Sequence, residues 1–227
     1  MMHSIIIPAY NEELRIRRTV KDYTKFFKRD YEFVVVCDGN DKTAEIVKKM
    51  SKYDKRIRVI ISKKRLGKGG GIYKGFDSAR GETIGFTDAD EGVKPSEYKK
   101  LLSYLEEYDC TIASRRAKGS NIIKNRPWHI IVVSFIFNRM VNLLFDLGIK
   151  DTQCGAKIIK KYVYNSIKHD VFLKGFEFDV EFLWRIKKAG FKIKEVPIEW
   201  SHDPRSKTNV KNHPNLLYQT IRLRLHG

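Results

Sequence analysis

The sequence predicts an α/β fold, a Rossmann-like arrangement in which helices cover both faces of a mostly parallel central sheet. Short, continuous apolar runs alternate along the chain with longer segments of helical patterning. Such runs are typical of strands that are buried on both faces. The chain has 227 residues, of which 42% are hydrophobic and 12% aromatic, and this is enough for a complete α/β core.

Five strands and four intervening helices are expected before residue 114. The strands are apolar runs too short for helices, at 4–7, 33–36, 58–61, 83–86 and 110–113. The helices lie between them, at 14–27, 43–50, 68–79 and 96–108. Farther along the chain, helical patterning is expected at 127–147 and 178–186, and residues 209–227 form a basic amphipathic segment.

The formal net charge of +18 predicts an anionic partner. Nucleic acid, an acidic membrane surface and a phosphorylated substrate would all be attracted by such a field, and a solubilising surface is the alternative. The sequence has no zinc-finger spacing, no RNP-like aromatic strand and no heptads beside a basic helix. We therefore expect no nucleic-acid partner.

The cysteines and the apolar segments suggest where the protein works. Cys37, Cys110 and Cys154 are far apart, odd in number and outside any CxxC spacing, so buried thiols in a reducing compartment are expected. No signal peptide is visible. The longest apolar stretch, 130–147, is interrupted by Asn138, Arg139, Asn142 and Asp146, and we expect it not to span a bilayer.

Two carboxylates one residue apart, Asp88 and Asp90, follow the apolar run at 83–86. If that run is a buried strand, both acids emerge at its carboxyl end, where open α/β sheets bind ligands. Neighbouring carboxylates repel each other unless a cation lies between them, and hard oxygen ligands suit Mg²⁺ or Mn²⁺ bridging a diphosphate. A solvated acidic turn is the alternative.

A glycine cluster, Gly67 with Gly69–Gly71, surrounds Lys68 at the start of a predicted helix. Its spacing is not that of a Walker motif, and it follows the third strand, whereas a dinucleotide fingerprint would follow the first. Glycines before a helix allow backbone N–H groups to approach an anion, to which Lys68 would add charge. A flexible turn is the alternative interpretation.

Seven short motifs together resemble a known family: Ile5–Glu12, Asp38–Asp41, Asp88–Asp90, Ala113–Arg116, Asp151–Lys157, Phe176–Glu181 and Glu195–Trp200. The first three look like the first half of a family 2 inverting glycosyltransferase, whose fold is called GT-A. The other four narrow the resemblance to dolichyl-phosphate glycosyltransferases, which move a sugar from a nucleotide diphosphate onto a polyprenyl phosphate. Lys68–Gly71 and Asp151–Gly155 look closer to the glucosyl branch than to the mannosyl branch.

The resemblance implies one GT-A domain over residues 1–208. Its nucleotide-sugar-binding half would be 1–113 and its acceptor-binding half 114–208. Two other function classes remain open. One is a family 2 transferase acting on a polysaccharide or other glycan, although its Gln-x-x-Arg-Trp motif is absent here. The other is a non-enzymatic basic protein that binds membranes or nucleic acid.

The resemblance also assigns the donor site, with Asp88 and Asp90 holding the metal, Mg²⁺ or Mn²⁺, and the donor diphosphate. Glu12 would lie near the ribose or base, and Asp38 would face the base edge. Cys37 and Asn40 depart from the family pattern beside Asp38, which leaves UDP and GDP both open. The expected nucleotide-sugar-binding residues are Pro8, Ala9, Tyr10, Glu12, Asp38, Lys68, Asp88, Ala89 and Asp90.

The acceptor site follows from the chemistry of a phosphate nucleophile. An alcohol acceptor needs a general base, but a phosphate monoester, with a second pKa of about 6, is largely a dianion at neutral pH. The enzyme must then supply positive charge, and arginine is the better phosphate clamp. The expected acceptor-phosphate residues are Arg115, Arg126, Arg205 and Lys207, and the catalytic residues are Asp90 and Arg115.

Three more residues are candidates for contact with the sugar: Gln153, Asp179 and Glu181. The two acids lie on a predicted helix whose Phe178 and Phe182 would face the core. Their alternative role is to cap and solvate that helix.

A lipid acceptor implies contact with a membrane. Residues 127–147 are apolar around most of the helix and would form an interfacial helix lying in the headgroup plane, or else a buried core helix. We expect a cytoplasmic protein associated peripherally with the cytosolic face of an anionic membrane.

Overall fold

The computed structural model describes residues 1–203 and 213–226 and contains a seven-stranded sheet in the order β3-β2-β1-β4-β7-β5-β8. Every neighbouring pair of these strands is parallel except the two that β7 forms with β4 and β5. The strands are β1 (His3–Ala9), β2 (Tyr31–Cys37), β3 (Ile57–Ile61), β4 (Thr83–Thr87), β5 (Cys110–Ser114), β7 (Ala156–Lys160) and β8 (Ile193–Pro197). A small second sheet pairs β6 (Asn121–Lys124) with β9 (Glu199–Ser201).

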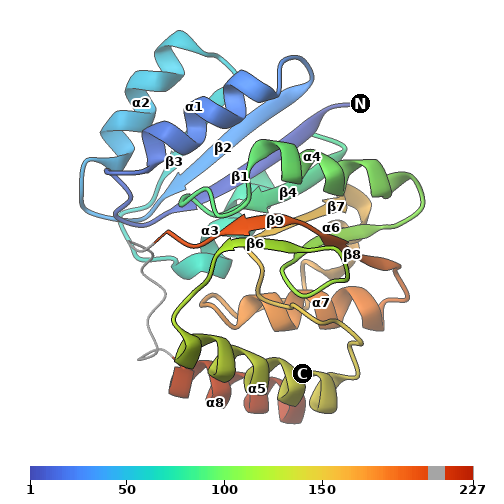
Figure 1. Ribbon diagram of the computed structural model, residues 1–227. Coiled ribbons are helices and arrows are strands. Elements are labelled where there is room, and N and C mark those ends of the chain that lie inside the picture. The colour runs from blue at the N-terminus through green and yellow to red at the C-terminus, as the bar shows by residue number, and fades with distance from the viewer. Residues whose placement is uncertain (204–212, 227) are drawn as a thin grey trace.

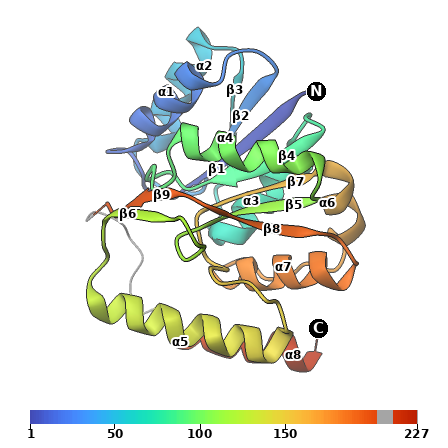
Figure 2. The same ribbon diagram turned by 45° about the vertical axis from the view of Figure 1, so that its right-hand side comes forward.

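Helices cover both faces of the sheet, and a further pair forms an outer layer (Figure 1). One face carries α1 (Ile16–Phe26), α2 (Thr43–Tyr53) and α4 (Pro95–Ser103), with the 3₁₀ turn η1 (Tyr104–Glu106) after α4. The other face carries α3 (Gly67–Ser78), α6 (Lys161–Ile167) and α7 (Phe178–Lys188). Beneath α7 in Figures 1 and 2 lie α5 (Trp128–Phe145) and α8 (His213–His226), side by side.

The two faces follow from strict alternation along the buried strands. Ile6 and Val34 point into the core cluster that α3, α6 and α7 cover. Ile5 and Ile7 point into the separate cluster beneath α1, α2 and α4. Because both faces are buried, the strands read as continuous apolar runs.

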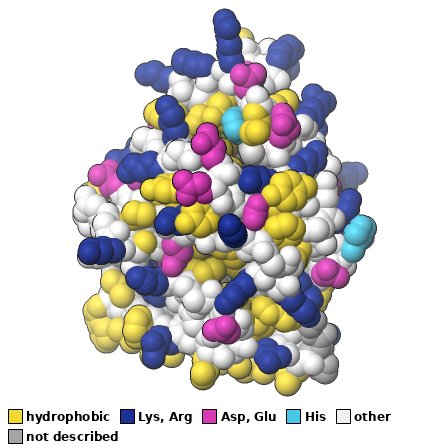
Figure 3. All heavy atoms as spheres, turned by 90° about the vertical axis from the view of Figure 1, so that its right-hand side faces the viewer, with side chains coloured by type: hydrophobic (Ala, Val, Ile, Leu, Met, Phe, Trp, Pro, Cys, Tyr) yellow, Lys and Arg dark blue, Asp and Glu magenta, His cyan; other side chains and the backbone are white. Residues whose placement is uncertain are grey.

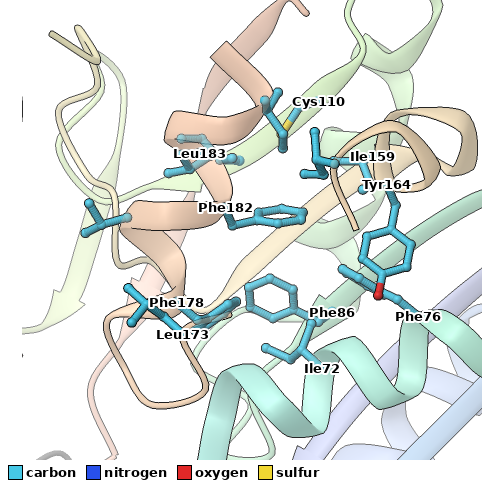
Figure 4. Packing of buried hydrophobic residues seen from close by; sticks show 14 of the residues in the cluster. Ile72, Phe76, Phe86, Cys110, Ile159, Tyr164, Leu173, Phe178, Phe182 and Leu183 are labelled. Atoms are coloured by element: carbon cyan, nitrogen blue, oxygen red, sulfur yellow. The ribbon is translucent and has the colours of Figure 1, made fainter. Parts of the chain in front are cut away.

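Aromatic rings fill the space between the sheet and α7 (Figure 4). The rings of Phe86 on β4 and Phe178 on α7 meet edge to face, with centroids 5.6 Å apart. Phe182, one turn farther along α7, contacts Phe76 of α3 at 6.0 Å. The predicted core roles of Phe178 and Phe182 are confirmed, since both are fully buried.

The predicted α/β architecture is confirmed, and all five predicted strands are present. The expectation that Cys37, Cys110 and Cys154 are buried free thiols is also confirmed. The antiparallel strand β7 was not predicted, although it inserts between β4 and β5 and so joins both halves of the chain in one sheet. The two-half division itself stays a prediction.

Helix α5 was expected not to span a bilayer because of its polar residues. By length and composition alone, however, its 18 residues meet the requirement for a membrane span, and only 22% of them are buried. Two of the polar residues turn inward: Asn138 and Asn142 each donate a hydrogen bond from Nδ2 to the carbonyl of Ile149. The inward side of α5 therefore forms hydrogen bonds within the protein, while its outer side is apolar and exposed.

The helices α5 and α8 present an apolar outer surface, here called the α5/α8 face. Figure 3 shows hydrophobic side chains gathered along the lower edge of the molecule, at the level of these helices in Figure 1. The exposed apolar residues of this face are Trp128, Ile131, Val132, Phe135, Ile136 and Leu143 of α5 and Leu217, Tyr218, Ile221 and Leu225 of α8.

The close contact of α3 with β1 gives a test of the packing. A Cβ atom at Gly75 would lie 2.5 Å from Ile6 Cγ2, whereas one at Gly70 would make ordinary contacts at 3.5 Å. Gly75→Ala should lower the free energy of unfolding by about 1–3 kcal/mol, because a buried β-branched side chain cannot move aside. Gly70→Ala is the matched control and should be neutral or stabilise by up to about 1 kcal/mol. Urea denaturation measures both, and equal effects would contradict this packing.

Candidate active site

The carboxyl ends of β1, β2, β4 and β5 open onto one cavity of about 350 Å³. Thirteen of the candidate residues line it: Pro8, Ala9, Tyr10, Glu12, Asp38, Lys68, Asp88, Ala89, Asp90, Arg115, Arg126, Gln153 and Asp179. Parallel strands place their carboxyl ends at the same edge of a sheet, so residues far apart in sequence converge there. Most of the candidate set thus lies at one place.

Asp88 and Asp90 lie just beyond the end of β4, as expected. Asp88 Oδ1 is 2.8 Å from the ammonium nitrogen of Lys68, in the first turn of α3. Asp90 Oδ1 accepts a hydrogen bond from the backbone N–H of Gly92 at 3.1 Å. Burial raises the pKa of Asp90, and the nearby charge of Asp88 raises it further. The pair therefore favours an additional positive charge beside Asp90.

Asp179 reaches the cavity from the first turn of α7 and is held in place by an ion pair with Lys157. The ammonium of Lys157, on β7, donates to Asp179 Oδ1 and also to the carbonyl of Cys154. Both side chains are almost completely buried. Burial raises the pKa of Asp179, and the charge of Lys157 opposes this rise. The ion pair holds Asp179 at the cavity wall, in keeping with its candidate role.

Glu181 does not line the cavity, and here the expectation of a sugar contact needs correction. Its Oε2 accepts hydrogen bonds from the backbone N–H groups of Phe172 and Leu173 at 3.0 and 2.7 Å. Glu181 therefore fastens the loop before α7. The physical reason is helical geometry: Asp179 and Glu181 are two positions apart on α7, and side chains with this spacing on a helix point to nearly opposite sides.

The glycine cluster does not form the anion cradle that its composition suggested. The N–H groups of Gly69 and Gly70 donate to the carbonyls of Gly175 and Lys174. A Cβ atom at Gly69 would lie 2.4 Å from Cβ of Phe178. The glycines thus allow α3 to pack closely against the segment before α7, and this packing brings Lys68 to the cavity.

Asp38 lies at the end of β2, where its carboxylate organises the start of α3. Asp38 Oδ2 accepts hydrogen bonds from the backbone N–H groups of Leu66 and Gly67 and from Arg65. The Arg65 guanidinium in turn lies 3.5 Å from the ring centroid of Tyr10. Arg65 was not predicted as a site residue, although it forms one wall of the cavity between the two candidates.

Glu12 is held by Arg15, another cavity residue that was not predicted. The Arg15 Nε and Nη2 atoms donate to the two carboxylate oxygens of Glu12 at 2.7 and 2.8 Å. The pair fixes the loop after β1 in a rigid, bidentate geometry. The three-residue spacing of these two side chains at a helix start was the available signal.

Arginines line the opposite side of the cavity. Arg115, just after β5, donates through Nε and Nη2 to Asp151, with both distances 2.7 Å. Burial alone would raise the pKa of Asp151, but the charge of Arg115 outweighs it and lowers that pKa to about 2. Arg116, the next residue, turns away and donates to Ser134 Oγ. Consecutive arginines therefore have different roles.

Arg126 shares the indole of Trp200 with Arg115. The two guanidinium carbons lie 5.6 and 5.3 Å from the centroid of the six- and five-membered ring system of Trp200. Among the described residues, Arg126 has no carboxylate within ion-pair distance. Burial lowers its pKa to about 10, and the neighbouring charge of Arg115 contributes. Arg126 is thus a partly buried cation that an incoming anion would stabilise.

The other two expected acceptor cations, Arg205 and Lys207, lie outside the described residues. His202, which was quoted only as a neighbour of Trp200, lines the cavity. Burial and the charge of Arg126 lower the pKa of His202, which favours the neutral imidazole. The cavity also contacts the apolar helices through Ile130 of α5 and Leu216 of α8.

Asp88 and Asp90 could hold a divalent metal only if a bound phosphate group or water supplied further ligands. Within residues 1–203 and 213–226, no three His, Cys, Asp or Glu side chains cluster closely enough to hold an ion alone. Asp88 and Asp90 supply the hard oxygen donors that Mg²⁺ and Mn²⁺ prefer. The remaining coordination positions would have to come from a bound phosphate group or water.

Comparisons with known proteins agree with this geometry. Residues 4–168 match the family described as "Glycosyl transferase family 2". Among curated relatives, Glycosyltransferase AglD of Haloferax volcanii is 33% identical over 215 residues, which cover 91% of this chain and 34% of that protein. The human Dolichyl-phosphate beta-glucosyltransferase is 32% identical over 222 residues, which cover 90% of this chain and 68% of that protein.

Solved structures share the fold at low sequence identity. Glucosyl-3-phosphoglycerate synthase from Mycobacterium tuberculosis, in complex with Mn²⁺, UDP and glucosyl-3-phosphoglycerate, superimposes with a TM-score of 0.76. It is 16% identical, and the match covers 98% of this chain and 79% of that one. Mannosyl-3-phosphoglycerate synthase from Rubrobacter xylanophilus gives a TM-score of 0.77 at 18% identity, covering 99% and 73%. The predicted GT-A fold is confirmed. The chain belongs to glycosyl transferase family 2 and is a glycosyltransferase.

Proposed function

We propose that this enzyme transfers a sugar, glucose in the first instance, from a nucleotide diphosphate to a dolichyl or other polyprenyl phosphate, with inversion. One observation carries the proposal. A single cavity joins a pair of carboxylates, Asp88 and Asp90, to a pair of partly buried guanidinium groups, Arg115 and Arg126. The curated relatives named dolichyl-phosphate beta-glucosyltransferases support the choice of acceptor and sugar. UDP sugars and GDP sugars are both candidate donors.

The acidic side is the donor side. Asp88 and Asp90 would hold Mg²⁺ or Mn²⁺ together with the donor diphosphate, and the metal would stabilise the negative charge of the departing nucleoside diphosphate. Tyr10 and Asp38 lie at the far wall, where the nucleoside would bind beside Arg65. The Mn²⁺ and UDP bound by the mycobacterial synthase support divalent metal use in this fold.

The basic side is the acceptor side. Asp151 fixes Arg115 in one orientation, so that little rotamer entropy is lost when a phosphate arrives. Arg126 brings a second charge without a carboxylate partner among the described residues. A phosphate dianion bound here is already a nucleophile and needs no base. Arg205 and Lys207 stay candidates for binding the acceptor phosphate, outside the described residues.

The lipid tail would leave the cavity on its apolar side. Ile130 and Leu216 line the cavity and belong to the two helices of the α5/α8 face. A neighbouring groove along α5 is lined by apolar side chains together with Arg116, Arg139 and Lys150, and by no acid. We propose that the α5/α8 face lies on an anionic membrane at its cytosolic surface. A polysaccharide acceptor would have no use for this apolar exit.

Transfer to lipid is the direct test of the function. The protein is incubated with radiolabelled UDP-glucose, GDP-mannose and other nucleotide sugars, polyprenyl phosphate and Mg²⁺ or Mn²⁺. Label should enter the organic phase from one donor. Asp90→Asn should reduce this transfer by about 10²-fold or more, because a neutral amide cannot balance the metal's charge. Its melting temperature should stay close to wild type, since Asn retains the acceptor for Gly92 N–H. Label that reaches only water-soluble glycans would refute the lipid acceptor.

A substitution at Arg126 tests the acceptor side. Arg126→Gln should lower kcat/KM for polyprenyl phosphate by about 10²-fold, the value of one preorganised donor to a developing or bound oxyanion. Arg126→Lys should restore part of this rate, because a point charge replaces the fork. Binding of the nucleotide sugar should not change. Arg115→Ala is the less informative variant, because it also leaves the Asp151 charge buried without a partner and so destabilises the fold. A larger loss of donor affinity than of acceptor affinity in Arg126→Gln would contradict the assignment.

Vesicle sedimentation tests the membrane face. Wild-type protein should pellet with vesicles rich in phosphatidylserine and less with neutral ones, and added salt should release part of it. Leu143→Glu, at a position 86% exposed on α5, should weaken sedimentation by about tenfold or more, since it replaces apolar contact by a charge. Tyr53→Glu, at a position 92% exposed on α2 at the far side of the sheet, is the matched control and should pellet like wild type. Equal behaviour of the two variants would exclude the α5/α8 face as the contact.

A further inference from the structure

The ammonium of Lys68 forms an ion pair with Asp88, a carboxylate that we assign to the metal. Its Nζ is 2.8 Å from Asp88 Oδ1, and its side chain is only 13% exposed. The ammonium also lies 5.7 Å from the ring centroid of Phe86 and 5.9 Å from that of Phe178. The two rings shield the ammonium of Lys68 from water on one side, whereas the side chain of Asp88 is 33% exposed.

The charges around Lys68 determine what it does in the absence of donor. Three aspartates, Asp88, Asp90 and Asp179, meet two lysines, Lys68 and Lys157. Lys157 is bound by Asp179 and a backbone carbonyl and is not available to Asp88. Lys68, at 2.8 Å from Asp88 Oδ1, therefore supplies the cation beside the proposed metal ligands.

We propose that Lys68 is the counter-ion of Asp88 in the donor-free enzyme and releases it when a divalent cation binds with the nucleotide sugar. This inference rests on the proposed metal role of Asp88 and Asp90. Two cations cannot share Asp88 Oδ1 at contact distance without strong repulsion. The donor diphosphate supplies the negative charge to which Lys68 then turns. Lys68 thereby couples binding of the divalent cation to binding of the nucleotide sugar: the cation would bind weakly alone and tightly together with the donor.

A purely structural ion pair is the competing explanation. In that case Lys68 would fasten α3 to the end of β4, and its loss would lower stability without favouring metal. Only the counter-ion explanation predicts tighter metal binding when Lys68 is neutralised, so a binding measurement separates the two.

The test measures Mn²⁺ binding without nucleotide, from the loss of the electron paramagnetic resonance signal of free Mn²⁺. Lys68→Met and Lys68→Gln should each bind Mn²⁺ at least about tenfold more tightly than wild type, because a competing charge at contact distance is removed. Lys63→Met is the matched control: it removes the same charge from an exposed side chain just before α3 and should change affinity by less than about twofold, because exposed charges are screened. Lys68→Arg keeps the charge and should bind no more tightly than wild type.

Adding UDP or GDP should reverse the order. With nucleotide present, Lys68→Met should bind Mn²⁺ and the nucleotide less tightly than wild type, because the diphosphate has lost its lysine. Neutral variants that stay folded but bind Mn²⁺ alone with unchanged or weaker affinity would overturn the proposal. The double variant with Asp90→Asn and Lys68→Met distinguishes an error in the proposed metal site from an error in the proposed role of Lys68. If it leaves Mn²⁺ affinity unchanged, the metal site is wrongly assigned, whereas a loss of affinity keeps the site and tests Lys68 alone.

Discussion

The buried charges at the carboxyl edge of the sheet are the constraint on which the rest of the structure depends. Asp88, Asp90 and Asp179 are brought together at one side of the cavity, where Lys68 pairs with Asp88 and Lys157 pairs with Asp179. Such a group of carboxylates is costly to bury without cations. In the proposed function, the metal and the donor would add the remaining cation and its anionic partner to this group.

The fold supplies these charges from elements that are distant in sequence. The antiparallel strand β7 is central to this, because it places Lys157 beneath Asp179 and Gly155 beside Asp88. A Cβ atom at Gly155 would lie 2.0 Å from Asp88 Oδ2, so only glycine leaves room for that carboxylate. On the other side, Asp151 precedes β7 and orients Arg115. One inserted strand thus organises both the acidic and the basic side of the cavity.

Much of the site could be predicted from the sequence because it follows from strand ends. Asp38, Asp88 and Arg115 each lie two residues after the end of an apolar run, and parallel strands bring such residues to one edge. The resemblance to a glycosyltransferase family added Gln153 and Asp179, which local patterning does not identify. The family membership is confirmed, but the individual roles of these residues stay predictions.

The errors have a common physical origin, since each depends on a contact between distant segments. Strand β7 was missed because Lys157 interrupts its apolar run, and its buried partner Asp179 lies on another element. The glycines of α3 looked like a phosphate loop because composition does not show that Phe178 packs against Gly69. Glu181 shared a motif with Asp179 but points away from the cavity, toward the N–H groups of Phe172 and Leu173.

The central claim is that one cavity has an acidic side for the metal and donor and a basic side for the acceptor phosphate. A crystal structure with Mn²⁺, a nucleoside diphosphate and inorganic phosphate tests it most directly, because anomalous scattering locates the metal. The account predicts Mn²⁺ between the diphosphate and the carboxylates of Asp88 and Asp90, with phosphate on the guanidinium groups of Arg115 and Arg126. A metal bound elsewhere, or phosphate that avoids both arginines while the nucleotide is in place, would contradict it.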